Sequence, residues 1–375
     1  MNYNLFVKCA SYLTQLKTKR GHKSSGYWKR LLEVDTIKLF FKPVLFFKRR
    51  KTLVLTYSTF KRHKKDEQYL DPLVEYVIDN IDDDPLVLEK NQRFLRFIPS
   101  YYKSSELNVL VLLLCKSIAF LIAKPIEFLI KILNKLNIID NKLPYIRIYI
   151  ETHVTACYFM LIILILRPKN VYFASQFSIE SMALCVSCNL LKIKCSEIQH
   201  GNIIKSSPIY NFSWLQFQPK FFANSFVVKN DVVKSVLLSS SRILDKKNIT
   251  IMNSEVLVNK ASNCLLVCLG ITDLPESVEN FINTSDYDSI ILRPHPGFKD
   301  LDLSQFKNVT RLLTMDNTQL SQDKSIGSDL VKSSCILCGA STVIIDAYSS
   351  GHNIYTWDSG SFEQYDEYRK LIKLI

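Results

Sequence analysis

The stretch CILCGASTVIIDAYSSGHNIYT, residues 335–356, contains the pattern that decides the fold. Its first four residues predict a strand, residues 342–350 predict a helix, and residues 353–356 predict a second strand. Gly351 stands just after the helix, where a glycine commonly ends one. A strand, a helix and a strand in so short a stretch indicate a parallel sheet covered by helices.

The same alternation extends over most of the chain. A first series predicts strands at 52–57, 86–89, 171–174 and 194–198, and helices at 71–81, about 106–134, 144–166 and 178–190. A second series adds strands at 264–269, 289–293 and 309–312, helices at 275–283, 300–306 and 325–333, and a last helix after residue 356. Between the two series, residues 241–262 are polar, lack clean periodicity and predict a linker.

These two series predict an α/β protein with two doubly wound, Rossmann-like domains, residues 51–240 and 263–375, that face a cleft. A chain of 375 residues is too long for one ordinary core and fits two domains. In such sheets, ligands bind outside the carboxyl ends of the strands. The sequence has only nine glycines and no G-x-G-x-x-G motif, so a dinucleotide fingerprint is absent.

The positive charge of the chain is concentrated at its start. Residues 1–65 hold 17 Lys and Arg against Glu33 and Asp35, whereas the remaining residues hold 31 against 33 acidic ones. Within residues 1–50 the cations alternate with Phe, Leu, Tyr and Trp, which favours docking to an anionic membrane surface over a nucleic-acid arm. A cationic cap on the first domain is the alternative. No nucleic-acid partner is expected.

Two later stretches are strongly apolar. Residues 107–123 are interrupted by Lys116, and residues 154–166 lead directly into a predicted strand. Both are short for a bilayer span. We expect the second to be a buried helix, whereas the first could instead lie in a membrane interface.

The ten cysteines, with no secretory signal peptide at the start, predict a reducing compartment. Two C-x-x-C pairs, Cys185/Cys188 and Cys335/Cys338, suggest zinc. Along a strand, however, thiols three residues apart point to opposite faces, so buried free thiols are expected. The Asp-x-Asp patterns at 82–84 and 286–288 fall at predicted turns. No metal and no cofactor are predicted.

Three polar clusters follow predicted strands, where a cleft would be lined. The first contains Glu197, Gln199, His200 and Gly201, with Lys205 four residues further on. The other two are the run Arg293–Pro294–His295–Pro296 and the turn formed by Gly339, Ser341 and Thr342.

The second and third clusters together predict a phosphate site. Prolines hold the residues before them extended, so Arg293 and His295 are fixed directly after a strand. The Gly339 turn offers free backbone N–H groups and two hydroxyls to an anion. Ser341 alone could be an ordinary helix N-cap.

These motifs resemble a known group of enzymes. Gln-His-Gly at 199–201, Arg-Pro-His-Pro at 293–296 and Gly-x-Ser-Thr-Val at 339–343 are similar to motifs of GT-B glycosyltransferases of bacterial capsule and O-antigen synthesis. In the related sialyltransferases, His-Pro and Ser-Ser/Thr motifs hold the phosphate of a CMP-sugar. The resemblance therefore implies that His295, Ser341 and Thr342 bind donor phosphate, with Gly339 in the turn and Arg293 a candidate by position.

The acidic-acidic-glycine motif of the sialyltransferases is not found, so the donor stays open between a CMP-nonulosonate and another nucleotide sugar. The spacing from His200 and Gly201 to Lys205 also resembles teichoic-acid polyol-phosphate transferases, in which an acidic residue such as Asp346 follows the serine turn. The alternative implied is transfer of a polyol phosphate from a CDP-polyol. A non-catalytic scaffold of polysaccharide assembly is the third alternative.

On the acceptor side we expect His200 to be the base, with Glu197 steadying the imidazolium and Gln199 orienting the acceptor. Lys205 and Asp346 are further acceptor-side candidates. Proton removal opposite the leaving phosphate implies inversion at the sugar carbon. The expected partners are a nucleotide-sugar donor, a lipid-linked or polysaccharide acceptor and the anionic inner face of the cytoplasmic membrane.

Overall fold

The structure is a computed structural model. The residues that it describes are 51–57, 63–65, 68–82, 84–90, 104–106, 109–135, 143–175, 178–199, 203, 210, 220–240, 244–252, 262–270, 273–294, 303–322, 326–339, 341, 343–358 and 372–375. The chain divides into two compact units, one of residues 1–200 with 216–226 and the other of residues 201–215 with 227–375. The division falls inside one strand, β8.

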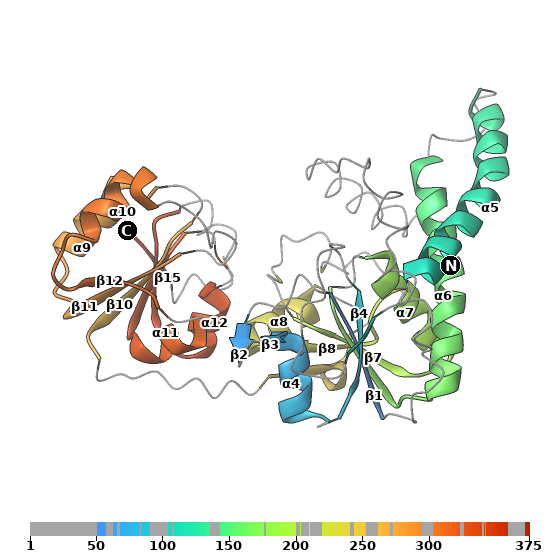
Figure 1. Ribbon diagram of the computed structural model, residues 1–375, viewed down its shortest axis with the longest axis horizontal. Coiled ribbons are helices and arrows are strands. Elements are labelled where there is room, and N and C mark those ends of the chain that lie inside the picture. The colour runs from blue at the N-terminus through green and yellow to red at the C-terminus, as the bar shows by residue number, and fades with distance from the viewer. Residues whose placement is uncertain are drawn as a thin grey trace. The chain divides into compact units, whose positions relative to one another are not determined.

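A seven-stranded sheet has the order β5-β4-β1-β6-β7-β8-β9 (Figure 1). Its strands are β1 Thr52–Tyr57, β4 Leu86–Lys90, β5 Ser104–Glu106, β6 Asn170–Ala174, β7 Lys194–Ile198, β8 Ser225–Val228 and β9 Ile249–Ile251. The pairs that join β5, β4, β1, β6 and β7 are all parallel. A separate antiparallel pair is formed by β2 His63–Lys65 and β3 Gln68–Leu70.

The helices that accompany this sheet are α4 Pro72–Asn80, α5 Val109–Lys135, α6 Leu143–Leu166, α7 Ile179–Leu190 and α8 Asp231–Ser239, with a short 3-10 turn, η3, at Lys246–Asn248. Helix α4 lies on one side of the sheet, and α6 and α7 lie on the other (Figure 1). Asp71 caps α4 by accepting the N–H of Leu73 at 2.9 Å, and Pro72 occupies the first turn, as the sequence predicts.

A six-stranded sheet has the order β12-β11-β10-β13-β14-β15, and all its pairs are parallel. Its strands are β10 Cys264–Cys268, β11 Ser289–Arg293, β12 Thr318–Leu320, β13 Cys335–Cys338, β14 Asn353–Thr356 and β15 Ile372–Leu374. Its helices are α9 Glu276–Asn283, α10 Lys307–Leu312, α11 Ile326–Lys332 and α12 Val343–Ser349, with a 3-10 turn, η4, at Leu303–Gln305. Helices α9 and α10 lie on one face, and α11 and α12 lie on the other (Figure 1).

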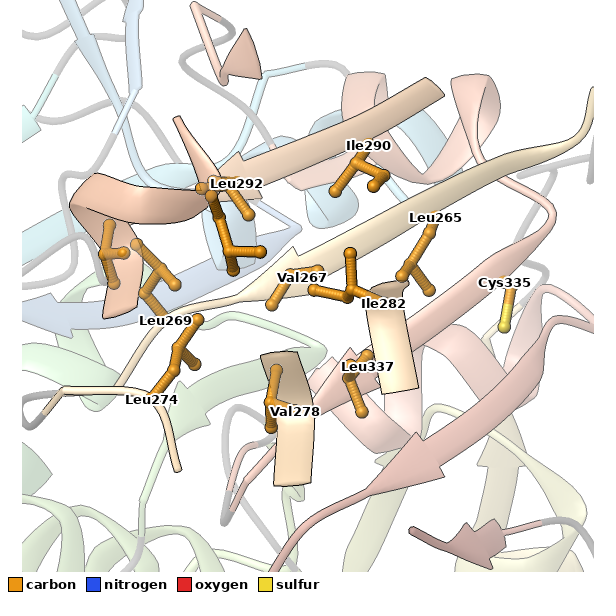
Figure 2. Close-up of a cluster of buried hydrophobic side chains, with 12 residues drawn as sticks. Leu265, Val267, Leu269, Leu274, Val278, Ile282, Ile290, Leu292, Cys335 and Leu337 are labelled. Atoms are coloured by element: carbon orange, nitrogen blue, oxygen red, sulfur yellow. The ribbon is translucent and has the colours of Figure 1, made fainter. Parts of the chain in front are cut away.

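The core between the six-stranded sheet and α9 and α10 is made of aliphatic side chains. Figure 2 shows Leu265 and Val267 of β10 and Leu337 of β13 in one cluster with Val278 and Ile282 of α9. The four-residue spacing of the two α9 residues places both on the buried side of that helix. This packing holds the strand ends of the sheet in fixed register.

Both sheets have the same strand order. Numbered along the chain within each sheet, and leaving out the β2–β3 pair, both begin 3-2-1-4-5-6, which is the Rossmann order. The predicted fold class of two doubly wound α/β domains is confirmed.

One predicted strand is wrong. Residues 309–312 form the end of helix α10, and the strand comes later, at Thr318–Leu320. Val309 and Leu312 are both buried, and a three-residue spacing places both on one side of a helix. The chain ends on strand β15, whereas most of the predicted last helix lies outside the described residues. Strand β9 and the η3 turn fall within the predicted linker, 241–262.

Candidate functional site

The carboxyl edge of the six-stranded sheet brings two of the predicted clusters close together. Arg293 ends β11 and Cys338 ends β13, and both pair in register with Cys268 of β10, which lies between them. With strands about 4.8 Å apart, the backbones of Arg293 and Cys338 are about 10 Å apart. The strand order reverses between β10 and β13, and this switch point is where doubly wound sheets bind ligands.

The side chain of Arg293 has a buried partner that the sequence did not reveal. Its Nη1 donates to Oδ2 of Asp329 in α11 and to Oγ of Ser321, the latter at 3.3 Å. Ser321 Oγ donates in turn to the same carboxylate oxygen at 2.7 Å. The guanidinium is therefore held at the sheet edge by a charged hydrogen-bond network. Pro294 follows it, whereas His295 and Pro296 lie outside the described residues.

The turn after β13 is shaped by an aromatic ring. A methyl group at Gly339 would lie 3.1 Å from Cε2 and Nε1 of the Trp357 indole, so only glycine fits without moving the ring. Ser341 Oγ accepts the N–H of Val343 at 3.2 Å, which is an ordinary capping contact for α12. Thr342 lies outside the described residues. Gly351 has φ 78° and stops α12, as predicted.

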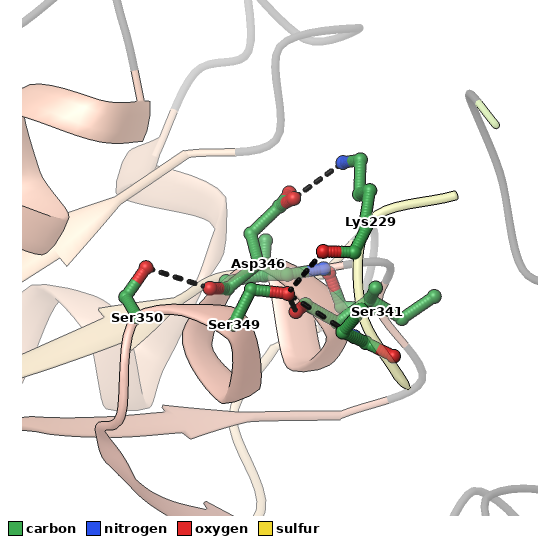
Figure 3. Close-up of polar contacts among 8 residues, drawn as sticks. Lys229, Ser341, Asp346, Ser349 and Ser350 are labelled. Carbon is green, nitrogen blue, oxygen red and sulfur yellow. Dashed lines mark hydrogen bonds and ion pairs between the residues drawn. The ribbon is translucent and has the colours of Figure 1, made fainter. Parts of the chain in front are cut away.

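Asp346 lies on α12, and Lys229, which follows β8, forms an ion pair with it (Figure 3). Ser349 Oγ donates to the backbone carbonyl of Lys229 at 3.3 Å, and Asn230 Nδ2 donates to Ser349 Oγ at 3.1 Å. Lys229, Asn230, Asp346 and Ser349 thus form one polar cluster within the second unit. The sequence named only Asp346 among them.

The first predicted cluster is only partly described. Glu197 lies in β7 and Gln199 follows it, and both are buried. Glu197 shares a strand face with Cys195, whose Sγ lies 3.9 Å from Sγ of Cys185 in α7. Burial is the main reason that the pKa of the Cys185 and Cys195 thiols is raised, and the charge of Glu197 adds to the rise. His200, Gly201 and Lys205 lie outside the described residues.

The seven-stranded sheet has its own switch point, between β1 and β6, which sequence reasoning missed. Tyr57 ends β1, and its hydroxyl hydrogen-bonds to Oγ of Ser178 and, at 3.0 Å, to Oγ of Ser181. Ser178 is also the N-cap of α7. Burial raises the pKa of Tyr57 well above its usual range, and the charge of Glu180 adds to it. A serine pair opening a helix directly after a predicted strand was the available signal.

Nearby, Thr56 Oγ1 donates to Oδ2 of the capping residue Asp71. A shallow polar pocket of about 440 Å³ involves Thr52 and Asn170, which begin β1 and β6. It therefore lies at the amino edge of the sheet, away from the edge that binds ligands in this architecture. Among the described residues, no group of three His, Cys, Asp or Glu side chains could hold a metal ion.

The two units are thus Rossmann-type α/β folds, and the second has a candidate anion site at its switch point. No protein-family model and no curated protein matches the sequence.

Solved structures with a similar chain trace include UDP-GlcNAc 2-epimerase from Methanocaldococcus jannaschii, with 12% identity over 87% of this chain and 89% of that one, and a TM-score of 0.44. The epimerase from Neisseria meningitidis, bound to UDP-GlcNAc, has 13% identity over 87% of each chain and a TM-score of 0.43. A glycosyltransferase from Rickettsia africae has 12% identity over 83% and 79%, and a TM-score of 0.41. The fold assignment rests on the strand order and register, not on these similarities.

Proposed function

We propose that this chain is a nucleotide-sugar-dependent glycosyltransferase that builds a surface polysaccharide such as an O-antigen or a capsule. The observation that carries the proposal is the switch point of the six-stranded sheet. There the end of β11, with Arg293, and the turn after β13, with Gly339 and Ser341, flank the end of β10. This is the position at which Rossmann-type sheets bind the phosphates of nucleotides.

In this proposal the second unit binds the donor. Ser341 and Thr342, with the backbone N–H groups of their turn, bind the donor phosphates, and His295 adds a donor or a proton as the leaving group gains charge. Arg293 is held by Asp329 and supplies positive charge beside them. These cations and N–H groups neutralise the leaving phosphate, so the proposed mechanism uses no metal ion.

The acceptor side of the proposal rests on His200. A neutral imidazole with a pKa near its usual value of about 6.5 accepts the proton of the acceptor hydroxyl at cellular pH. Glu197 steadies the resulting imidazolium, and Gln199 and Lys205 bind the acceptor. Because the base acts opposite the leaving phosphate, the reaction inverts the sugar carbon. The enzyme would act in the cytoplasm at the inner face of the membrane, on a lipid-linked or polysaccharide acceptor.

The test is an incubation of the purified chain with CMP-, UDP-, GDP- and CDP-activated donors, followed by detection of released nucleotide. Release from one sugar nucleotide, lost in Ser341→Ala and kept in Ser350→Ala, would support the proposal. Ser350 is a matched control because it also lies at α12, where its Oγ donates to the Asp346 carbonyl at 2.8 Å. Release from a CDP-polyol alone would favour the polyol-phosphate alternative. Donor binding without release under all conditions would favour a scaffold.

A further inference from the structure

Helix α5 presents a long apolar face to the surface. Leu114, Leu121 and Phe128 are 58%, 70% and 66% exposed. They are seven residues apart, so they form one stripe along the helix. Leu129 and Ile132, also exposed, continue the stripe toward its carboxyl end. From Leu114 to Ile132 the stripe is about 27 Å long at 1.5 Å per residue.

The opposite side of α5 is small and buried. Cys115, Ala119 and Ala123 recur every four residues and face α6, and Cys115 Sγ lies 3.9 Å from the carbonyl oxygen of Val154. Helix α6 in turn packs against α7, which covers the sheet. Helix α5 is therefore the outermost layer on this side of the first unit (Figure 1). The exposed stripe is not a by-product of poor packing, because the helix has a well-formed inner face.

Lysines border the stripe. Lys124 and Lys131 each follow a stripe residue, Leu121 and Phe128, by three positions, which is about 60° around the helix axis. Both lysines are exposed, as is Lys116. Arg147 of α6 adds a cation on the same side, since its guanidinium lies 4.8 Å from the centre of the Phe120 ring and Lys124 Nζ lies 4.9 Å from it. Helix α5 holds one carboxylate, Glu127, against four lysines.

We propose that α5 lies in the plane of an anionic membrane surface, with the stripe of Leu114, Leu121 and Phe128 inserted among the lipid chains and the lysine row contacting the headgroups. An apolar face next to a cationic row is the arrangement by which interfacial helices bind anionic bilayers. The aliphatic stems of lysines at that border lie along the apolar layer while their ammonium groups reach the headgroups.

Two other occupants fit less well. A bilayer span would bury the charges of Lys116, Lys124 and Lys131, which are spread along the helix, in hydrocarbon. A second copy of the chain would bring two lysine rows near one stripe, with Glu127 as the one compensating carboxylate on each helix. Helix α6 is, among the described residues, the one helix whose length and composition would allow a span, from Ile146 to Leu166. One of its faces, however, including Phe159 and Ile163, is buried in the protein.

The test is sedimentation of the full chain with vesicles of phosphatidylcholine alone and of phosphatidylcholine mixed with phosphatidylglycerol, without nucleotide. The double variant Leu121→Gln/Phe128→Gln should lower partitioning onto mixed vesicles on the order of 100-fold, because two large apolar side chains no longer insert. The double variant Lys124→Gln/Lys131→Gln should lower it about tenfold, and only on the anionic vesicles. All variants retain residues 1–50, so the contribution of that segment is constant.

The matched control is Leu190→Gln/Val331→Gln, because both of these residues are apolar and 46% exposed, on α7 and α11. Its binding should equal that of the parent chain. Circular dichroism melts establish that each variant is folded. Unchanged vesicle binding in the folded Leu121→Gln/Phe128→Gln variant would overturn the proposal and leave residues 1–50 as the docking segment. A parent dimer that this variant converts to monomer, with vesicle binding retained, would overturn it in favour of self-association. The proposal does not depend on the transfer reaction, since binding alone tests it.

Discussion

Arg293 and Asp329 form an ion pair in which the carboxylate side chain is 1% exposed and that of the arginine 12% exposed. The pair connects the end of β11 to α11 and fixes one side of the switch point. A buried charge that loses its partner keeps its desolvation cost without the compensating attraction. The two residues therefore contribute to stability together, and a change at either one tests this.

Arg293→Gln or Asp329→Asn should lower the free energy of unfolding by about 3–5 kcal/mol, as expected for breaking a buried pair. Urea unfolding followed by circular dichroism measures the loss. The control is Lys247→Gln, which breaks a pair with Asp245 whose side chains are 78% and 68% exposed and should cost less than about 1 kcal/mol. Equal small losses in all three variants would show that the buried pair is not a stabilising unit. Because of this loss, activity data for Arg293 variants need a stability correction.

His295→Ala tests the donor site without that complication. If His295 contacts the leaving phosphate, its removal should slow nucleotide release on the order of 100-fold, the scale for losing one such donor. The melting temperature should stay that of the parent chain. A variant that is folded and as fast as the parent would assign only a backbone role to the Arg-Pro-His-Pro run.

His200→Asn tests the base. Asparagine keeps much of the size and polarity of histidine but accepts no proton at neutral pH, so turnover should fall and lose its dependence on a group titrating near pH 6.5. The pH profile of the rate measures this. Near-parental turnover would exclude His200 and move attention to Glu180. Asp71 would be a weaker candidate, because its carboxylate already caps α4 and accepts from Thr56.

Cys268 makes the stability of the second unit sensitive to alkali. Burial raises the pKa of its thiol from 9.0 to about 12, partly opposed by the positive charge of Arg293. Above pH 9 the unfolded thiol ionises while the folded one stays neutral, so the free energy of unfolding falls as pH rises from about 9 toward 12. Cys268→Ala should make that fall shallower in urea unfolding at several pH values under reducing conditions. Identical pH slopes in the two proteins would contradict this assignment.

The elements of the fold could largely be predicted, because helix and strand periodicities are local. The strand at 335–338 and the helix stop at Gly351 are examples. Residues 309–312 show the limit, since two apolar residues three apart in a short stretch fit either type of element. Strand order was also out of reach, because it depends on pairings between segments far apart in the chain.

The candidate site could be predicted in its positions but not in its partners. Arg293, Gly339 and Ser341 were found because each directly follows a strand. Asp329 is 36 residues beyond Arg293, and Lys229 is 117 residues before Asp346. No local pattern links such residues, so the networks that hold the site were visible only in the folded chain. The roles of His200, His295 and Thr342 stay predictions.

The closeness of Gly339 to the indole of Trp357 has a practical consequence. An indole changes its emission when the polarity or charge around it changes, and this ring lies against the turn proposed to bind phosphate. Nucleotide binding should therefore alter the intrinsic fluorescence of the unlabelled protein. Trp357 is one of three tryptophans in the sequence, so replacing it with phenylalanine would identify its share of the signal. The chain thus contains its own optical probe, and donor affinities could be titrated before any acceptor is known.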